Sequence, residues 1–431
     1  MNTELSFGTT IKTTYGEEWT IQDKLGEGGQ GYVYRIEKNG VKKALKWYKP
    51  RAINEEFKEH IRMSIMNGTP SNGFIWPTDI VESGETGFGY IMELKPENYC
   101  DMTDILCQNR KFTSFRRVVD AAMHIVSEMR VLHNKGYSYQ DLNDGNFFID
   151  PVRGRILVCD NDNVTINGKS TGVLGKPRYM APEIVRGNNM PDICSDRFSM
   201  ALIIFRLITL GHPLEGIRST GEMLTPDLQM VLYGTDPVFI FDPEDTRNRP
   251  DPEIHQNEIA IWSCLPQYMK DIFIKAFGKS GLMQPIHRPT EVEWIDALVR
   301  FRSDIVSCSC GSEVFVQEDG KAVCDCCGRL ISIPNWLELP EYRIPGTRDS
   351  RIYQCQTCIT DVEDALEPIG RVIMAKGQPE KLGIRNMSSN QWDAITSKGK
   401  QRSVQPNEVI PLKDGIQFTV NESTIHIRGG K

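Results

Sequence analysis

The sequence predicts an α+β chain in which a β-rich lobe is followed by a helix-rich lobe and then by two small modules. Three observations lead to this prediction. Strand-like apolar runs surround a glycine cluster near the N-terminus, and residues 115–134 carry apolar side chains at helical spacing. Two close groups of cysteines follow between Cys308 and Cys327, and short apolar runs separated by turn signals occupy residues 347–431.

The 431 residues are too many for one ordinary core, so we expect several domains. The net charge of −7 argues against a general nucleic-acid-binding role. Because no apolar run is as long as a membrane span and we expect no secretory signal, we predict a cytoplasmic protein without membrane contact. The expected segments are 1–94 and 95–303 for the two lobes, 304–335 for a cysteine ribbon, 336–346 for a linker and 347–431 for a β-sandwich-like module.

The stretch from residue 139 to residue 162 carries the side chains that phosphoryl transfer needs. It contains Asp141, the amide of Asn146 five residues later, and the carboxylate of Asp160 at the end of an apolar strand. Carboxylate and amide oxygens suit Mg²⁺, which also binds phosphate oxygens. One carboxylate is left to orient a hydroxyl group, so the layout predicts a phosphoryl-transfer site.

A glycine cluster lies between two strand-like runs in the first lobe. Gly26, Gly28 and Gly31 have the G-x-G-x-x-G spacing of a turn that can lay backbone N–H groups over phosphates. A dinucleotide-binding turn would need a helix directly after the glycines, whereas residues 32–34 are strand-like. The pattern therefore favours a kinase-type phosphate loop over a Rossmann turn, with a plain glycine-rich hairpin as the alternative.

A series of motifs in order across residues 20–300 resembles that of a eukaryotic-like Ser/Thr protein kinase of bacterial type. Asp141 and Asn146 match the catalytic-loop Asp and Asn, and Asp160 matches the metal-binding Asp of the D-F-G motif. The resemblance implies a bilobal protein-kinase fold that uses ATP and Mg²⁺. The other matches are the glycine loop, Lys46, the activation-segment end Gly175–Glu183, Ser195–Ser199 and His287-Arg288-Pro289.

The resemblance also implies a role for each matched residue. Asp141 would orient the substrate hydroxyl and take its proton, while Asn146 and Asp160 would hold Mg²⁺. Lys46 would hold phosphates of ATP and completes the expected catalytic set. Two further pairings are implied, Asp196 with the backbone of the catalytic loop and Arg288 with Glu183.

A carboxylate partner for Lys46 is expected on the predicted helix Ile53–Met66. Glu59 is our choice because Met63 and Met66 follow it at helical spacing as apolar neighbours, and Glu56 is the alternative. Residues 90–94 resemble the hinge between kinase lobes, with Met92 as the gatekeeper. The expected nucleotide site comprises Gly26, Gly28, Gly31, Val33, Ala44, Lys46, Glu59, Met92, Glu93 and Leu94.

Several residues beside these motifs depart from the family pattern. The Arg of H-R-D, which anchors a phosphorylated activation loop, is Gln140, so we expect activity without phosphorylation at Ser170 or Thr171. The catalytic-loop Lys, which stabilises the transferring phosphate, is Asn143. The D-F-G motif reads D-N-D, in which Asp162 is either a further metal ligand or, as we favour, an exposed carboxylate.

These departures leave two hypotheses for function. The first is an active kinase that transfers the γ-phosphate of ATP to Ser or Thr of a partner protein. We favour it because the four central residues of the catalytic set are all present. The second is a nucleotide-binding pseudokinase that acts as a signalling scaffold.

The cysteines between residues 308 and 327 form two knuckles around a predicted hairpin, which is the pattern of a tetrahedral zinc ribbon. The second knuckle offers three thiols for two places. We choose C-x-x-C with a following glycine, which leaves Cys326 as a spare. The predicted Zn²⁺ ligands are Cys308, Cys310, Cys324 and Cys327.

The last module contains Gly383–Ser388, which loosely resembles a loop of forkhead-associated-like sandwiches. Arg385, Asn386 and Ser388 would bind a phosphothreonine there, although a plain loop is favoured. The C-x-x-C of residues 355–358 lacks a second pair, so we expect it to be without metal, with an extension of the first cysteine cluster as the alternative.

The order of kinase, zinc ribbon and β-module resembles the kinases of bacterial phosphorylation triads linked to tellurium-resistance-type systems. That resemblance implies two protein partners, a von Willebrand factor A domain protein and a metal-dependent phosphatase. It also implies that the substrate is a partner Ser or Thr and that the phosphatase reverses the modification.

Residues 212–262 form a long polar stretch inside the second lobe. We expect a surface excursion there, with a docking site for a substrate or partner as the alternative, because long loops often carry function.

Overall fold

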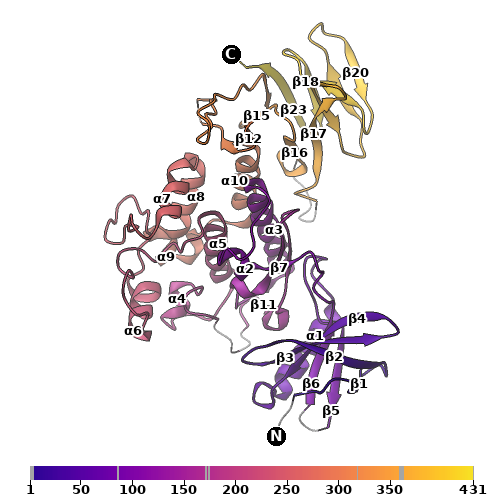
Figure 1. Ribbon diagram of the computed structural model, residues 1–431, viewed down its shortest axis with the longest axis vertical. Coiled ribbons are helices and arrows are strands. Elements are labelled where there is room, and N and C mark those ends of the chain that lie inside the picture. Colours follow the sequence, from indigo (N-terminus) through magenta and orange to yellow (C-terminus); the bar gives the residue numbers. More distant parts are fainter. Residues whose placement is uncertain are drawn as a thin grey trace. The chain divides into compact units, whose positions relative to one another are not determined.

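The computed structural model describes residues 4–84, 87–169, 172, 175–317, 319–358 and 364–430 (Figure 1). The chain divides into two compact units. The first unit comprises Met1–Lys111, Val131–Pro151 and Arg155–Ser199. The second unit comprises Phe112–Arg130, Val152–Gly154 and Met200–Lys431.

An antiparallel six-stranded sheet dominates the first unit, with the order β1-β2-β3-β4-β6-β5. Side chains alternate between its faces because each strand is extended. On β4, Leu45 and Trp47 therefore join one apolar cluster, while Tyr48 joins a second cluster against helix α1. The strands are β1 (Thr10–Lys12), β2 (Glu18–Glu27), β3 (Gly31–Lys38), β4 (Val41–Tyr48), β5 (Asp79–Ser83) and β6 (Gly87–Met92).

Helix α1 (Glu55–Asn67) agrees with the predicted helix Ile53–Met66 within two residues at each end. Asn54 caps its N-terminus, since its side chain accepts a hydrogen bond from the backbone N–H of Phe57 at 2.7 Å. Gly68 ends the helix with a φ of +74°, which a residue with a side chain rarely adopts.

Short strands and turns complete the first unit and surround the catalytic loop. Strands β8 (Tyr137–Ser138) and β11 (Thr165–Ile166) pair, and β10 (Arg155–Val158), β9 (Phe147–Asp150) and β7 (Cys100–Asp101) form a small sheet in that order. The loop between β8 and β9 carries Asp141, and Asp160 follows β10. The helical elements are η1 (Pro50–Ala52), α2 (Met102–Leu106), η2 (Asp144–Asn146), η3 (Asn161–Asn163) and α4 (Pro182–Val185).

The second unit begins with a helical core. Helix α3 spans Phe115–Asn134, as predicted, and aromatic side chains of the helices that follow pack edge to face, for example Phe205 on Phe273 at 5.2 Å between ring centroids. The helices that lie wholly or partly in this unit are α3, α5 (Ile193–Thr209), α6 (Pro226–Gln229), η4 (Met230–Thr235), α7 (Gln256–Cys264), α8 (Gln267–Phe277), α9 (Lys279–Met283), η5 (Pro285–His287) and α10 (Glu291–Ser303), and residues 131–134 of α3 and 193–199 of α5 belong to the first unit.

The expectation of a surface excursion at residues 212–262 is wrong for much of this segment. Phe239 and Ile240 are fully buried, and Phe241 stacks on Trp262 at 4.4 Å with nearly parallel rings. Asn248 donates two hydrogen bonds from its side-chain amide to backbone carbonyls and so satisfies the turns of this segment. A few large aromatic residues among many polar ones were enough to fold it into the core.

A small cysteine module follows α10 and is tied to α3. Its strands β12 (Ile305–Ser307) and β13 (Glu313–Phe315) pair antiparallel. Arg116 of α3 lies 3.3 Å from the Glu313 carboxylate and donates to the carbonyl of Ile305 at 2.7 Å. Phe115 and Phe315 pack at 5.3 Å, so the module is fixed to the helices of its unit by charge and by apolar contact.

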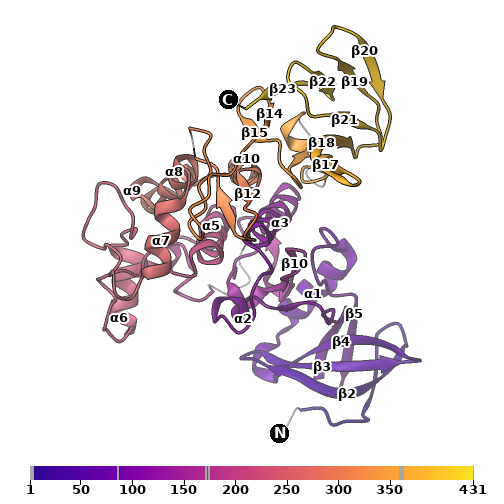
Figure 2. The same cartoon turned by 45° about the horizontal axis from the view of Figure 1, so that its top comes forward.

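The C-terminal residues form a β-sandwich of two sheets, whose strands can be followed in Figure 2. One sheet has the order β15-β14-β23-β22-β19-β20 and the other β16-β17-β18-β21. Inward-facing residues of both sheets build one apolar core around Trp392 and Phe418, which stack at 5.2 Å. The strands are β14 (Asn335–Glu338), β15 (Arg343–Pro345), β16 (Arg351–Tyr353), β17 (Pro368–Ala375), β18 (Gln378–Asn386), β19 (Trp392–Ile395), β20 (Gln401–Val404), β21 (Val409–Pro411), β22 (Gln417–Val420) and β23 (Ser423–Gly429), and η6 spans Gln354–Gln356.

The predicted linker at residues 336–346 is wrong, because these residues lie in β14, β15 and the turn between them. Leu337 and Ile344 are fully buried in the sandwich core. Pro334 and Pro345 lie at the two ends of this hairpin and Pro340 lies in its turn, all positions where a strand pair tolerates proline.

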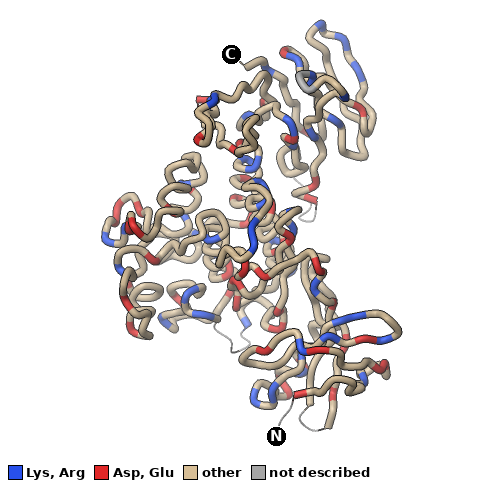
Figure 3. Tube along the Cα trace, viewed as in Figure 1, with Lys and Arg blue, Asp and Glu red and all other residues tan. Residues whose placement is uncertain are grey.

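The described residues show two further properties, the polarity of their helices and the distribution of their charges. None of their helices is long and apolar enough to cross a membrane. Lys and Arg are interspersed with Asp and Glu along both compact units in Figure 3, in keeping with the modest net charge of −7.

Candidate active site

Lys46 is the centre of the site in the first unit. It lies on β4 in the middle of the sheet and is only 7% exposed. Its ammonium group contacts Asp162 at 2.6 Å and also contacts Asp160. Both carboxylates belong to the D-N-D motif that follows β10, so this motif is joined to the sheet by charge.

Asp162 is completely buried, which makes the favoured expectation of an exposed carboxylate wrong. Its side chain accepts hydrogen bonds from Lys46 and from the hydroxyl of Tyr48. Lys46 and Tyr48 are two residues apart on one strand and therefore point to the same face. The backbone carbonyl of Asp162 lies 3.0 Å from Nε2 of His60 on α1.

Glu59 is not the partner of Lys46 in this structure, and the prediction of that pair is wrong. The Glu59 carboxylate is exposed and lies 3.4 Å from Arg62. It lines a cavity of about 1070 Å³ beside α1, together with Glu56. The sequence misled because Met63 and Met66 were taken as buried neighbours, whereas they are 44% and 79% exposed.

The charges of this cluster reinforce one another. Burial alone would lower the pKa of Lys46, but the neighbouring carboxylates outweigh it and hold that pKa well above its usual value. Burial acts to raise the pKa of Asp162, yet the lysine and the Tyr48 hydroxyl lower it overall. Burial and the charge of Asp162 raise the pKa of Asp160. The pKa directions thus favour the carboxylate form more at Asp162 than at Asp160.

The catalytic loop is held by Asp196 at the start of α5. The Asp196 carboxylate accepts hydrogen bonds from the backbone N–H groups of Tyr139 at 2.6 Å and Gln140 at 3.0 Å. This confirms the predicted contact between Asp196 and the catalytic-loop backbone. The side chain of His133 lies 3.2 Å from the same carboxylate.

Asp141 lies next on this loop, where it is half-buried. Asn143 donates from its side-chain amide to the Asp141 carboxylate at 3.0 Å and to the Asp141 carbonyl at 2.9 Å. Burial raises the pKa of Asp141 to about 6, with Asp160 adding to the rise and Asn143 and Lys176 opposing it. A carboxylate with this pKa can accept a proton near neutral pH.

Asn146 and Asp160 are the two residues expected to hold Mg²⁺. Asn146 is buried, and its side-chain oxygen accepts a hydrogen bond from the backbone N–H of Asn143 at 2.8 Å while keeping a second lone pair. The Asp160 side chain is 42% exposed. Both offer oxygen donors, which are the ligands that Mg²⁺ prefers, so the residues present fit this ion.

Gln140 holds the activation segment without any charge. Its side-chain amide donates to the backbone carbonyl of Lys169 and to Ser138 Oγ at 3.2 Å. The two predicted phosphorylation positions, Ser170 and Thr171, lie outside the described residues. The neutral amide thus contacts the backbone beside the place where the family pattern puts an arginine–phosphate contact.

The glycine loop between β2 and β3 is a hairpin, closed by the bond from the Gly28 N–H to the Gly31 carbonyl at 2.9 Å. A β-carbon on Gly31 would lie 2.3 Å from the carbonyl oxygen of Trp47 on β4. A β-carbon on Gly26 or Gly28 would meet no atom within 4 Å. Gly31 is thus required by packing, whereas Gly26 and Gly28 face open space.

The remaining predicted nucleotide-site residues lie on or beside the same sheet. Val33 on β3 pairs with Lys46, and Ala44 on β4 pairs with Met92 at the end of β6. Glu93 and Leu94 follow Met92 directly, and the exposed Glu93 lies 2.8 Å from Lys43. Contact of these residues with ATP stays a prediction. Glu183 and Arg288 are both buried but belong to different units, and their pairing also stays a prediction.

Residues 19–267, more than half of the chain, match the family description "Protein kinase domain". The chain belongs to the protein kinase domain family. The predicted kinase fold and the predicted protein-kinase function are confirmed by this match. The kinase domain starts at β2 and extends to the beginning of α8.

The relatives of this kinase domain include bacterial proteins. "Protein kinase YegI" of Escherichia coli (strain K12) is 25% identical over 322 residues, which cover 70% of this chain and 47% of that protein. "Serine/threonine-protein kinase pkn3" of Myxococcus xanthus is 22% identical over 302 residues, which cover 66% of this chain and 49% of that protein. The chain thus spans about half the length of these curated relatives.

A solved structure, the twitchin kinase region from C. elegans, aligns with 65% of this chain and 45% of its own at 16% identity and a TM-score of 0.48. The family assignment rests on the sequence matches.

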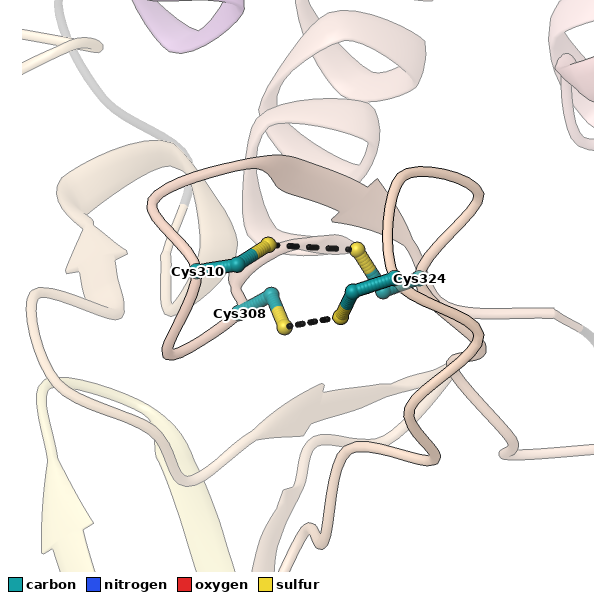
Figure 4. A group of neighbouring side chains, drawn as sticks. Cys308, Cys310 and Cys324 are labelled. Atoms are coloured by element: carbon teal, nitrogen blue, oxygen red, sulfur yellow. Dashed lines mark hydrogen bonds between the residues drawn. The ribbon is translucent and has the colours of Figure 1, made fainter.

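A second candidate site lies in the cysteine module, where the sulfurs of Cys308, Cys310, Cys324 and Cys327 all lie within 4.8 Å of one another (Figure 4). These are the four cysteines chosen from the sequence, and Cys326 is exposed and outside the group. The sulfurs of Cys308 and Cys327 are 3.6 Å apart. Hydrogen bonds from Ser312 lower the pKa of Cys310 to about 6, which favours the metal-binding thiolate.

In the predicted phosphothreonine loop of the sandwich, the side chains of Asn386 and Ser388 form hydrogen bonds within the module. Asn386 is fully buried and donates from its side chain to the carbonyls of Asn390 and Val404. Ser388 Oγ donates to the Asn386 side-chain oxygen at 2.7 Å and accepts from the Trp392 indole at 3.1 Å. These bonds support the favoured interpretation of a plain structural loop.

Alanine substitution of Gly31 and of Gly28 tests which of these two loop glycines is required by packing. We expect Gly31→Ala to lower the free energy of unfolding by about 1–3 kcal/mol, because its β-carbon would overlap the Trp47 carbonyl. Gly28→Ala should change it by less than about 0.5 kcal/mol, since the space there is open. Urea unfolding of both variants measures the difference, and equal stability would contradict this account of the hairpin.

Proposed function

We propose that this chain is an active Ser/Thr protein kinase that transfers the γ-phosphate of ATP to a hydroxyl group of a partner protein. The observation that carries the proposal is the placement of Asp141, on a loop pinned by Asp196 and with Asn143 as a hydrogen-bond donor. A carboxylate held in this way is preorganised to accept a proton. Lys46 and Asp160 lie in the same compact unit.

In the proposed reaction the substrate oxygen attacks the γ-phosphorus while its proton passes to the Asp141 carboxylate. The bond from the γ-phosphorus to the oxygen bridging the β-phosphate breaks, and ADP leaves with that electron pair. Lys46 and the backbone of Gly28–Gly31 would bind phosphates, and Asn146 and Asp160 would hold Mg²⁺. When bound, Mg²⁺ neutralises negative charge on the phosphates.

We also propose that the kinase does not need phosphorylation of its activation segment. The neutral hydrogen bond from Gln140 to the Lys169 carbonyl supports this, because a backbone carbonyl is always present whereas a phosphate must be added. An arginine at this position would be a buried charge that needs an anionic partner, and Gln140 is 5% exposed.

We propose that the four-cysteine cluster binds Zn²⁺ in a structural ribbon. A tetrahedral site with Zn–S bonds of about 2.3 Å places its sulfurs about 3.8 Å apart. The sulfurs of Cys310 and Cys324 are 3.5 Å apart, close to that edge length. The apolar core beside the cluster is small, so metal binding would contribute much of the module's stability.

The proposed protein substrate is a partner of the type implied by the phosphorylation triads. The order of kinase, cysteine module and β-module supports a von Willebrand factor A domain protein as the substrate carrier and a metal-dependent phosphatase as the enzyme that removes the phosphate. The bacterial kinases among the relatives are in keeping with this proposal.

Transfer of ³²P from [γ-³²P]ATP tests the proposed function. Wild type and Asp141→Asn are incubated with the candidate partner proteins, and ATP binding is measured in parallel. We expect label on Ser or Thr of a partner with wild type only, and equal ATP binding by both proteins. ATP binding without transfer by wild type would instead favour the pseudokinase, and label on small molecules alone would exclude the protein substrate.

The fall of kcat at low pH should reflect protonation of the Asp141 carboxylate. Because burial raises its pKa to about 6, the carboxylate is ionised above that pH and becomes protonated below it. We expect kcat to fall about tenfold per pH unit below about 6, measured from pH 4.5 to 8 with protein integrity checked by circular dichroism. A profile that is flat down to pH 5 would argue against Asp141 as the base.

Metal content tests the cysteine cluster. We expect one Zn²⁺ per chain by elemental analysis, and its loss in Cys310→Ser with a lower melting temperature. Cys326→Ser is the matched control, since this thiol is exposed and outside the cluster, and it should keep the metal. Full zinc content in Cys310→Ser, or its loss in Cys326→Ser, would show that the ligand set is different.

A further inference from the structure

Lys176 of the activation segment lies beside the catalytic loop, and both belong to the first unit. Its ammonium group donates a hydrogen bond to the side-chain oxygen of Asn143 at 2.7 Å. Asn143 in turn donates from its amide nitrogen to the Asp141 carboxylate at 3.0 Å. A positive charge therefore lies one side chain away from the proposed base.

The backbone around Lys176 fixes this position. Gly175 comes so close to Asp141 that a β-carbon on it would lie 3.2 Å from the carboxylate, and its φ of +92° suits glycine. The carbonyl of Lys176 accepts hydrogen bonds from the N–H groups of Tyr179 at 2.8 Å and Met180 at 3.1 Å. These contacts fix the backbone of Lys176 beside the catalytic loop.

The catalytic loop itself lacks a cation. Residues 139–146 contain neither Lys nor Arg, and Asn143 occupies the position where the family pattern has lysine. Negative charge on the transferring phosphoryl group is spread over three oxygens, and a nearby cation stabilises it. An ammonium group has three N–H donors, of which the bond to Asn143 uses one, and the Lys176 side chain is exposed.

We propose that Lys176 is a catalytic residue whose ammonium group binds oxygens of the γ-phosphoryl group during transfer, in place of a catalytic-loop lysine. The inference rests on the proposed kinase activity. Lys176 forms no covalent bond in the step. The γ-phosphorus gains the substrate oxygen and loses the oxygen of ADP, the proton goes to Asp141, and Lys176 contributes only charge and hydrogen bonds.

Steady-state kinetics of Lys176→Ala and Lys176→Arg test the proposal. We expect Lys176→Ala to lower kcat about 10²–10³-fold, the usual effect of losing one donor to a developing anion, with little change in the KM for ATP. The arginine variant should retain more activity than the alanine variant.

The pH profile adds a readout that a purely structural residue would not change. Lys176 lowers the pKa of Asp141, so its removal should move the acid limb of kcat toward higher pH. Lys169→Ala is the matched control, since it removes an exposed cation from the same segment and leaves the backbone carbonyl that Gln140 binds.

Failure of the proposed kinase activity and failure of the proposed role of Lys176 give different results. No transfer by wild type would refute the proposed kinase activity. Transfer by wild type together with wild-type kcat in Lys176→Ala would refute the role of Lys176 alone.

An independent observation concerns Asp162, which takes the place expected for a carboxylate of α1. Asp162 is fully buried and lies 2.6 Å from the Lys46 ammonium group, and the Tyr48 hydroxyl also donates to it. Both carboxylates of α1 that were candidates for this pair are exposed. Asp160, the other partner of Lys46, is the residue expected to turn to Mg²⁺.

We infer that Asp162 is the positioning residue that holds Lys46 toward the ATP phosphates once Asp160 is bound to metal. Because the pair is made within the sheet and the D-N-D motif, it does not require a carboxylate from α1. This inference rests on the proposed ATP-dependent activity, and it concerns ATP binding more than the chemical step.

Asp162→Asn, of nearly equal size, and the double variant Glu56→Gln with Glu59→Gln test this inference. We expect Asp162→Asn to raise the KM for ATP at least tenfold, and the double variant to keep kcat and KM within twofold of wild type. Thermal unfolding shows whether Asp162→Asn is folded. If it is not, the double variant still decides, since a tenfold rise in its KM for ATP would refute the inference, as would an unchanged KM in folded Asp162→Asn.

Discussion

The buried ion pair between Lys46 and Asp162 joins the central strand of the sheet to the segment that carries Asp160, a predicted metal ligand. Removing one member of a buried pair of this kind costs about 3–5 kcal/mol, because the remaining charge is left without a partner. Tyr48 and His60 surround the same carboxylate residue, so strand β4 and helix α1 both depend on its position. The site is assembled around this residue.

The activation segment contributes more of the site here than the motif pattern alone indicates. Asp160, Asp162 and Lys176 all come from this one segment. Gln140 fixes it through a backbone carbonyl, and Asp196 fixes the catalytic loop that it meets. Positive and negative groups that would otherwise come from separate elements are thus placed by a single stretch of chain.

The sequence predicted much of the fold because its strongest signals were local. The helix Phe115–Asn134 and the four clustered cysteines follow from spacing alone. The partner of Lys46 could not be found in this way, since it depends on which face of α1 turns inward. The alternation of Lys46 and Tyr48 on one strand was the available signal, because a buried tyrosine hydroxyl needs an acceptor such as Asp162.

Asn161 gives the D-N-D motif a consequence for inhibitor selectivity. This buried side chain donates hydrogen bonds to the carbonyls of Ile75 at 2.8 Å and Val158 at 3.0 Å. Compounds that bind only after this motif inverts would have to break both bonds and separate Asp162 from Lys46. Compounds that bind without inverting the motif would leave these contacts intact, so the bonds of Asn161 disfavour the first class of compounds.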